Sequence, residues 1–225
     1  MKLVFALWGP DSEALLGKAF RAALANAGAS RVQVNLDDDE IPESVLRLQA
    51  FPEAVTAVLA VWTEPQTDSD AVVEALDGLA RRVEGWEVEE RVPLEPPAVA
   101  DGRRADALAQ VAFLRRPADL PHPAWRAHWL GPHTQIAMET QAPFGYVQNL
   151  VLRPVTPDAS PVAESVEELF PSAAMRDIHA FYGSGGDDEE LSRRMTRLLE
   201  SVATMGADRD IDVVPTSRYV FDLRA

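Results

Sequence analysis

Two adjacent prolines near the middle of the 225-residue chain most constrain its fold, because one order of elements is found on both sides of them. They stand in the segment Leu-Glu-Pro-Pro at residues 94–97. Proline has no backbone N–H group to donate, so this segment can extend neither a helix nor a sheet and is predicted to be a linker. We therefore expect two domains, residues 1–97 and residues 98–225, each long enough to fold as a small domain.

The first half has the periodicity of a β-α-β-β-α-β unit. Two segments repeat apolar residues at helical spacing, and the others are short apolar runs or alternate between polar and apolar residues. The pattern predicts strands at 2–8, 31–36, 54–62 and 86–92, and helices at 12–27 and 70–83. This order is typical of the ferredoxin-like fold.

The second half repeats the order with little visible sequence identity. The pattern predicts strands at 105–115, 146–155, 178–182 and 212–223, helices at 122–140 and 188–205, and an irregular insertion at 158–172. Two four-stranded sheets with helices on one face can bury their bare faces against each other. We therefore expect an α+β chain of two tandem ferredoxin-like units that form an α/β-barrel pseudo-dimer within one chain.

The composition excludes several classes of partner and cofactor. A formal net charge of −15 argues against nucleic acid and anionic membrane surfaces, which both need clustered Lys and Arg. The chain has no cysteine, which excludes disulfides, iron–sulfur clusters and thiolate zinc sites. The apolar run at 3–8 is shorter than a signal peptide requires, and no segment approaches the ~20 apolar residues of a membrane span. We expect a cytoplasmic protein that binds a small molecule, as a monomer or a homodimer.

All the histidines lie in the second half, at positions 122, 128, 133 and 179. A rotation of about 100° per residue places Trp125, Trp129 and His133 on one face of the predicted helix, although Pro132 can kink it. An apolar face with one imidazole is typical of a small-molecule pocket. Because imidazole titrates near neutral pH, His133 is the candidate general acid or base.

The other polar candidates are less well placed. His128 is expected about 140° away from His133 on the helix, at the surface or an interface, and this separation argues against a shared metal site. His122 is expected to mark the entry of the helix. His179 is predicted on a strand, on one face with Phe181.

Two residues of the strand at 146–155 lie on opposite faces. Tyr146 or Asn149 could orient a carbonyl or a phenol, and the alternation does not say which face lines a pocket. No nucleophile elbow and no HExxH motif is present, so we expect neither a metal nor a cofactor.

Four short motifs occur in one order along residues 105–223. They are VAFLRRP at 111–117, two tryptophans and His133 at four-residue spacing, YVQN at 146–149, and VEELFPS at 166–172. In these motifs the second half resembles the EthD family of the dimeric α/β-barrel superfamily. It departs from the family in having Gly131-Pro132 before the histidine, and the first half keeps only the order of elements.

The asymmetry between the two halves implies one site per chain, in the second half, and the resemblance supports His133 as its catalytic group. The substrate would be aromatic or polyketide-like, and the reaction an elimination, a cyclisation or a cofactor-free oxidation. The residues expected to bind it are Trp125, Trp129, Tyr146, Asn149, His179 and Phe181. Two alternatives stay open. The chain could be a non-catalytic barrel that binds a small molecule, or a haem-binding tandem barrel with His133 or His179 as iron ligand.

Overall fold

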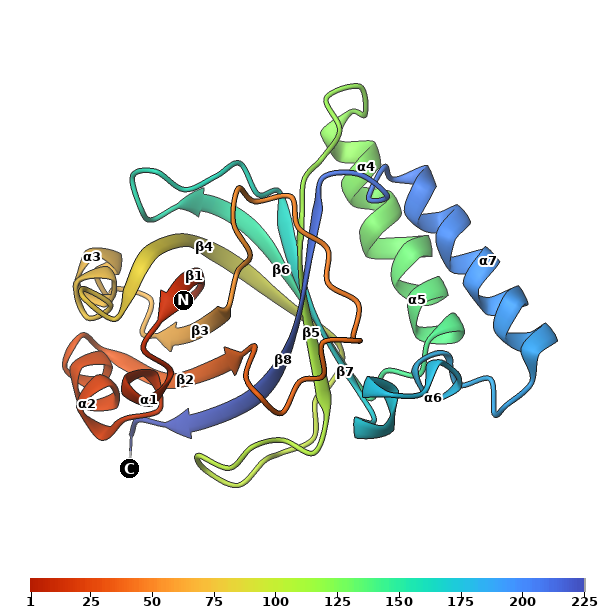
Figure 1. Cartoon of the computed structure of the whole chain (residues 1–225). Coiled ribbons are helices and arrows are strands. Elements are labelled where there is room, and N and C mark those ends of the chain that lie inside the picture. The colour runs from red at the N-terminus through yellow and green to blue at the C-terminus, as the bar shows by residue number, and fades with distance from the viewer. Residues whose placement is uncertain (225) are drawn as a thin grey trace.

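The computed structural model describes residues 1–224, in which eight antiparallel strands close into a barrel (Figure 1). The strands are β1 (Lys2–Pro10), β2 (Ala29–Leu36), β3 (Ala57–Thr63), β4 (Ala80–Leu94), β5 (Leu108–Leu114), β6 (Gly145–Pro154), β7 (Glu164–Phe170) and β8 (Ile211–Asp222). The helices are α1 (Ser12–Leu15), α2 (Lys18–Asn26), α3 (Ser69–Glu74), α4 (His122–His128), α5 (Thr134–Thr140), α6 (Ile178–Tyr182) and α7 (Asp188–Thr204). A π-helical turn (Trp129–His133) joins α4 to α5, and a 3-10 turn (Ser172–Met175) precedes α6.

Each half of the chain contributes four neighbouring strands to the barrel. The first half supplies β4-β1-β3-β2 and the second half supplies β8-β5-β7-β6, and the two sets meet at the β2–β8 and β4–β6 pairs. The order β-α-β-β-α-β therefore occurs on both sides of residues 95–99, which form neither helix nor strand. The predicted α+β class is confirmed, whereas Leu94 of the predicted linker belongs to β4 and pairs with Tyr146.

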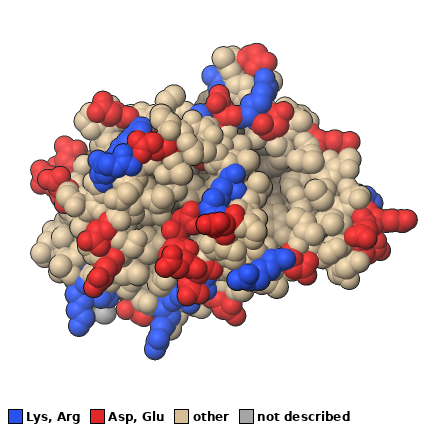
Figure 2. Space-filling view, in the orientation of Figure 1, with Lys and Arg blue, Asp and Glu red and all other residues tan. Residues whose placement is uncertain are grey.

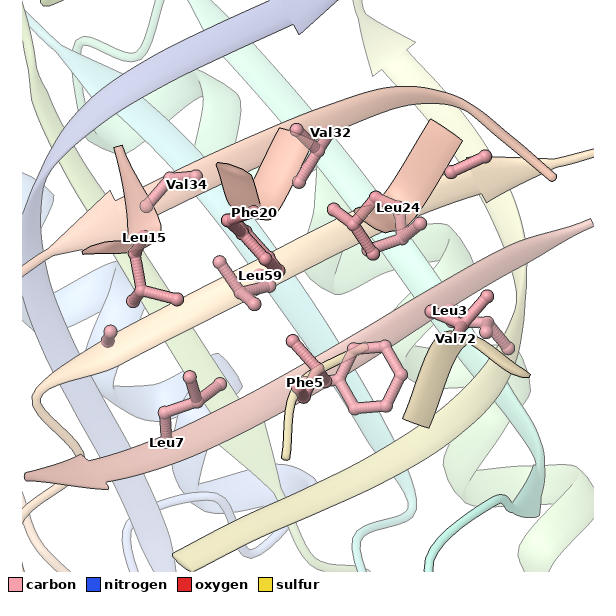
Figure 3. Close-up of a cluster of buried hydrophobic side chains, with 14 of the residues drawn as sticks. Leu3, Phe5, Leu7, Leu15, Phe20, Leu24, Val32, Val34, Leu59 and Val72 are labelled. Carbon is pink, nitrogen blue, oxygen red and sulfur yellow. The ribbon is translucent and has the colours of Figure 1, made fainter. Parts of the chain in front are cut away.

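The barrel lies between two layers of helices (Figure 1). Alternate residues of each strand face opposite sides, so β1 packs Leu3 and Phe5 outward against the first-half helices and Val4 and Trp8 into the lumen. Figure 3 shows the outer core around Phe5. In the second half, α4, α5 and α7 cover the outer face of the sheet.

Two predictions for the second half are wrong. The third strand is β7, inside the segment predicted to be an irregular insertion, and residues 178–182 form the helix α6. The side chain of Asp177 caps α6 by accepting a hydrogen bond from the backbone N–H of His179. His179 and Phe181 therefore do not share the face of a strand.

The second helix of the first half is shorter than predicted. α3 ends at Glu74, and the chain turns at Gly78, whose φ of +74° lies in the left-handed region that glycine adopts readily. β4 then begins at Ala80, within the predicted helix, and runs for 15 residues.

The helix at 122–140 is confirmed, but it is not regular. Residues 129–133 form a π-helical turn around Pro132, which lacks the N–H that a regular helix needs there. The wider turn brings the rings of His128 and His133 to a centroid distance of 6.5 Å, so the predicted separation of about 140° is wrong. No helix within residues 1–224 is both long and apolar enough to cross a membrane.

Candidate functional site

A cavity of about 200 Å³ lies between the outer face of the second-half sheet and the helices, and we name it the helix-side cavity. Apolar side chains form most of its wall, among them those of α7, β5, β7 and β8. The polar residues that reach it include Gln110, His133, Tyr146 and Glu168. On the face seen in Figure 2, the surface between the central strands and α7 is largely uncharged. This is the composition of a site for a weakly polar small molecule.

Glu168 is a titratable group of this cavity with a strongly raised pKa. It stands on β7, directly across from Gln110 of β5 and Tyr146 of β6. Its Oε1 is buried and has no hydrogen-bond partner within residues 1–224, and burial raises the pKa of the carboxyl to about 7. A carboxyl in an apolar pocket whose pKa lies near neutral pH is typical of an acid–base catalyst.

His133 lines the same cavity from the π-helical turn. Its Nδ1 lies 3.0 Å from Oγ of Ser201 on α7, and the same Oγ lies 3.4 Å from Nε2 of His128. Burial, and then the charge of His128, lower the pKa of His133 to about 4. The imidazole is therefore neutral at pH 7, and Ser201 fixes the orientation of its ring.

Trp129 is the tryptophan with an unsatisfied donor. The indole N–H groups of Trp8, Trp62, Trp86 and Trp125 each donate a hydrogen bond, whereas Nε1 of Trp129 has no partner within residues 1–224. Trp129 is fully buried and lines the cavity. A buried donor without a partner is costly unless a ligand or water engages it.

The structure brings together four of the residues predicted for the site. His133, Trp129, Tyr146 and Phe181 all line the helix-side cavity. Trp125 lies behind Trp129, with ring centroids 6.2 Å apart, and donates its indole N–H to the carbonyl of Met205 at 2.9 Å. Trp125 thus packs behind Trp129 and does not itself line the helix-side cavity.

The two remaining predicted residues lie elsewhere. Asn149 is on the inward face of β6 and donates a hydrogen bond to Oγ of Ser165 at 3.3 Å. His179 on α6 places Nδ1 2.7 Å from Oγ of Ser184 and Nε2 3.5 Å from Oδ1 of Asp188. Neither side chain lines the helix-side cavity.

Sequence reasoning missed Glu168 and the contribution of the first half. The loop between β2 and β3 crosses to the second half, where Leu48 exchanges two backbone hydrogen bonds with Val213. Leu46 and Leu48 line the helix-side cavity and yet remain 58% and 41% exposed. An apolar pair exposed at the rim of an apolar cavity marks its entrance.

A second cavity of about 370 Å³ adjoins the first. The two share lining residues from the loop, β5 and α6, namely Leu46, Gln110, Phe181 and Tyr182. A substrate of several rings therefore has room to extend from Glu168 past Phe181.

We expect Leu46→Ala to weaken the binding of an apolar ligand about tenfold, because roughly 1–2 kcal/mol of apolar contact is removed. The free energy of unfolding should change little, since the side chain is mostly exposed. Leu152→Ala is the matched control, because Leu152 is 56% exposed and lies outside the cavity. Equal affinities of the two variants, measured by calorimetry, would show that Leu46 takes no part in binding.

A haem does not fit these residues. The cavity that His133 lines is smaller than the macrocycle, and its lining includes no Lys or Arg to pair with propionates. Both ring nitrogens of His179 lie near protein partners. Within residues 1–224, no three His, Asp or Glu side chains gather in a metal-binding arrangement.

Comparisons with known proteins show the fold alone. No family model matches the chain, and no curated protein matches its sequence. An anthrone oxidase-like protein of known crystal structure aligns over 100% of this chain and 94% of its own, with 12% identity and a TM-score of 0.52. A proposed monooxygenase of Fusobacterium nucleatum aligns over 98% and 92% of the two chains, with 7% identity and a TM-score of 0.48.

A chlorite dismutase variant of Candidatus Nitrospira defluvii aligns over 96% of this chain and 90% of its own, with 13% identity and a TM-score of 0.42. The chain has the α/β-barrel fold of the anthrone oxidase-like protein.

Proposed function

We propose that the chain is an enzyme that removes a proton from an aromatic or polyketide-like small molecule in the helix-side cavity. One observation supports it above all others. Glu168 has a buried, unpartnered Oε1 and a pKa raised to about 7, in an apolar cavity that His133 also lines. A carboxyl that is only half ionised at neutral pH is able both to take up and to return a proton.

The residues divide the chemistry between them. The carboxylate of Glu168 accepts a proton from a phenol O–H, or from a C–H next to a carbonyl. The indole N–H of Trp129 and the hydroxyl of Tyr146 are donors for the oxyanion that forms, and the apolar wall excludes water. His133, neutral at pH 7, is the second proton-transfer group. Elimination, cyclisation and oxidation without a cofactor all begin with such an anion.

The fold supports an EthD-like assignment. Both halves have the strand order 4-1-3-2 that two tandem ferredoxin-like units require, and we assign the units to residues 1–97 and 98–225. The helix-side cavity belongs to the second unit, and the first unit closes it through Leu46 and Leu48. We therefore propose one substrate site per chain. The anthrone oxidase-like protein of the same fold suggests tricyclic phenols and ketones as the first substrates to test.

The experiment is a turnover assay with phenols and anthrone-type ketones. We expect His133→Gln to lower kcat about 10²- to 10⁴-fold, the range for loss of an acid–base group. His179→Gln is the matched control, since His179 lies outside the cavity and should keep full activity. Full turnover by His133→Gln would contradict a catalytic role for this histidine.

A non-catalytic binding protein is the alternative that the same assay addresses. It would bind one aromatic ligand per chain and return it unchanged after prolonged incubation. In that case Glu168→Gln would alter affinity, and no product would form with any variant.

A further inference from the structure

The barrel lumen holds a third cavity, of about 540 Å³, at one end, and we name it the barrel-end cavity. Its strand residues stand at inward-facing positions, such as Lys2 on β1 and Glu167 on β7. Glu167 points to the opposite side of the sheet from Glu168, so the barrel-end cavity and the helix-side cavity are separate. Val4, Trp8 and Phe113 belong to the apolar core that fills the rest of the lumen. Mouths of small β-barrels are recurrent ligand sites.

In an acidic chain with 36 Asp and Glu residues against 21 Lys and Arg, the lining of this cavity has as many basic as acidic side chains. The basic ones are Lys2, Arg31 and Arg218, and the acidic ones are Glu90, Glu95 and Glu167. Lys2 and Arg218 are 6% and 8% exposed, and the guanidinium of Arg31 lies 3.6 Å from the ring centroid of Trp62. All four residues line the cavity. Burying cations in this way is costly without partners.

The protein satisfies these cations only in part. Lys2 Nζ lies 2.7 Å from Glu90 Oε1. Arg218 uses Nε alone, 3.0 Å from Oε1 of Gln33 and 3.2 Å from Oε1 of Glu167. Within residues 1–224, the two terminal nitrogens of Arg218 and the whole guanidinium of Arg31 make no hydrogen bond or salt bridge. A guanidinium presents a planar fork of donors that matches a carboxylate.

The linker between the halves forms one wall of the cavity. Residues 95–99 line it, and its two prolines hold that wall stiffly. Gly145 makes this approach possible, because a Cβ on it would lie 3.1 Å from Cα of Pro96. Val92, Val99 and Val147 supply an apolar surface beside the polar groups. The site is therefore preformed, with an apolar side and a charged side to which both arginines belong.

We infer that the barrel-end cavity is a second binding site, which takes a small organic carboxylate between Arg31 and Arg218 and packs its apolar body against the valines. The inference does not depend on the proposed function, because it uses the inner face of the sheet and none of the residues of the helix-side cavity.

Calorimetric titration with benzoate tests this inference, with benzamide as the neutral isostere. We expect one benzoate per chain, much weaker binding of benzamide, and at least a tenfold loss of benzoate affinity in Arg31→Gln, because hydrogen bonds to charged groups are strong. Arg31 is exposed at the rim, so this variant should fold normally. Arg21→Gln is the matched control, since Arg21 also stacks on a ring, that of Phe221 at 4.5 Å, but lies outside the cavity.

Four results would overturn the inference, and three of them concern benzoate, benzamide and Arg31. They are no benzoate binding by the wild type at millimolar concentration, equal binding of benzoate and benzamide, and unchanged benzoate affinity in Arg31→Gln. A loss of affinity in Glu168→Gln in place of Arg31→Gln would also overturn it, because benzoate would then occupy the helix-side cavity.

Discussion

Replacing Glu168 by glutamine is expected to abolish turnover and, at pH 8, to make the folded chain more stable. Burial raises the pKa of this carboxyl from 4.5 to about 7, so between these pH values the folded chain binds more protons than the unfolded chain. The free energy of unfolding therefore falls as the pH rises through this window, and the full decrease is reached above pH 7. A pKa shift of this size lowers the free energy of unfolding by up to about 3 kcal/mol. A neutral glutamine avoids this loss.

Urea unfolding at pH 5 and pH 8 measures this effect. We expect Glu168→Gln to exceed the wild type in unfolding free energy at pH 8 and to differ little from it at pH 5. The control is Glu167→Gln, on the opposite face of β7, where the carboxylate accepts hydrogen bonds from Gln33 and Asn35 and pairs with Arg218. That variant should lose stability. A Glu168→Gln protein that is less stable than the wild type at pH 8 would show that the carboxyl has a structural role.

Replacing Arg126 by methionine is expected to lower the unfolding free energy by about 3–5 kcal/mol above pH 7, since it leaves a buried carboxylate without its partner. Arg126 on α4 lies 2.6 Å from Oε1 of Glu164 on β7, and Glu164 is fully buried. Burial nonetheless raises the pKa of Glu164 to about 7. Below that pH the orphaned carboxyl can protonate, so the loss should shrink as the pH falls.

A double-mutant cycle tests the ion pair directly. Adding Glu164→Gln to Arg126→Met should restore most of the lost stability, because the buried charge is then removed and the amide can still accept the hydrogen bond from the N–H of Val151. Additive losses in the double variant, measured by urea unfolding at pH 8, would show that the two side chains act independently.

The order of elements could be predicted because it depends on local periodicity. The linker follows from two prolines, and the face shared by Trp129 and His133 follows from their four-residue spacing. The π-helical turn could not be derived, although Pro132 marked the position of the irregularity. The turn and α5 both contact α7, which is distant in sequence, and the turn brings His128 next to His133.

The strand β7 was not predicted, because three of its seven residues are glutamates, which are typical of exposed and irregular segments. The residues that surround each glutamate are distant from it in the sequence. Glu164 pairs with Arg126, Glu167 bonds to Gln33 and Asn35 of the other half, and Glu168 faces the helix-side cavity. In the same way, no local sequence pattern predicts that Leu46 and Leu48 line a cavity in the other half of the chain.

The most direct test of the account is the response of the Trp129 indole N–H to an aromatic ligand. In a ¹H–¹⁵N spectrum the five tryptophans give five indole signals, and Trp129→Phe identifies the one that matters. Titration with 1-naphthol should move the Trp129 signal and saturate at one ligand per chain, because this buried donor is unpartnered and its side chain lines the cavity. Binding of 1-naphthol that leaves the Trp129 signal in place, or that moves the signal of Trp62 instead, would contradict the placement of the substrate in the helix-side cavity.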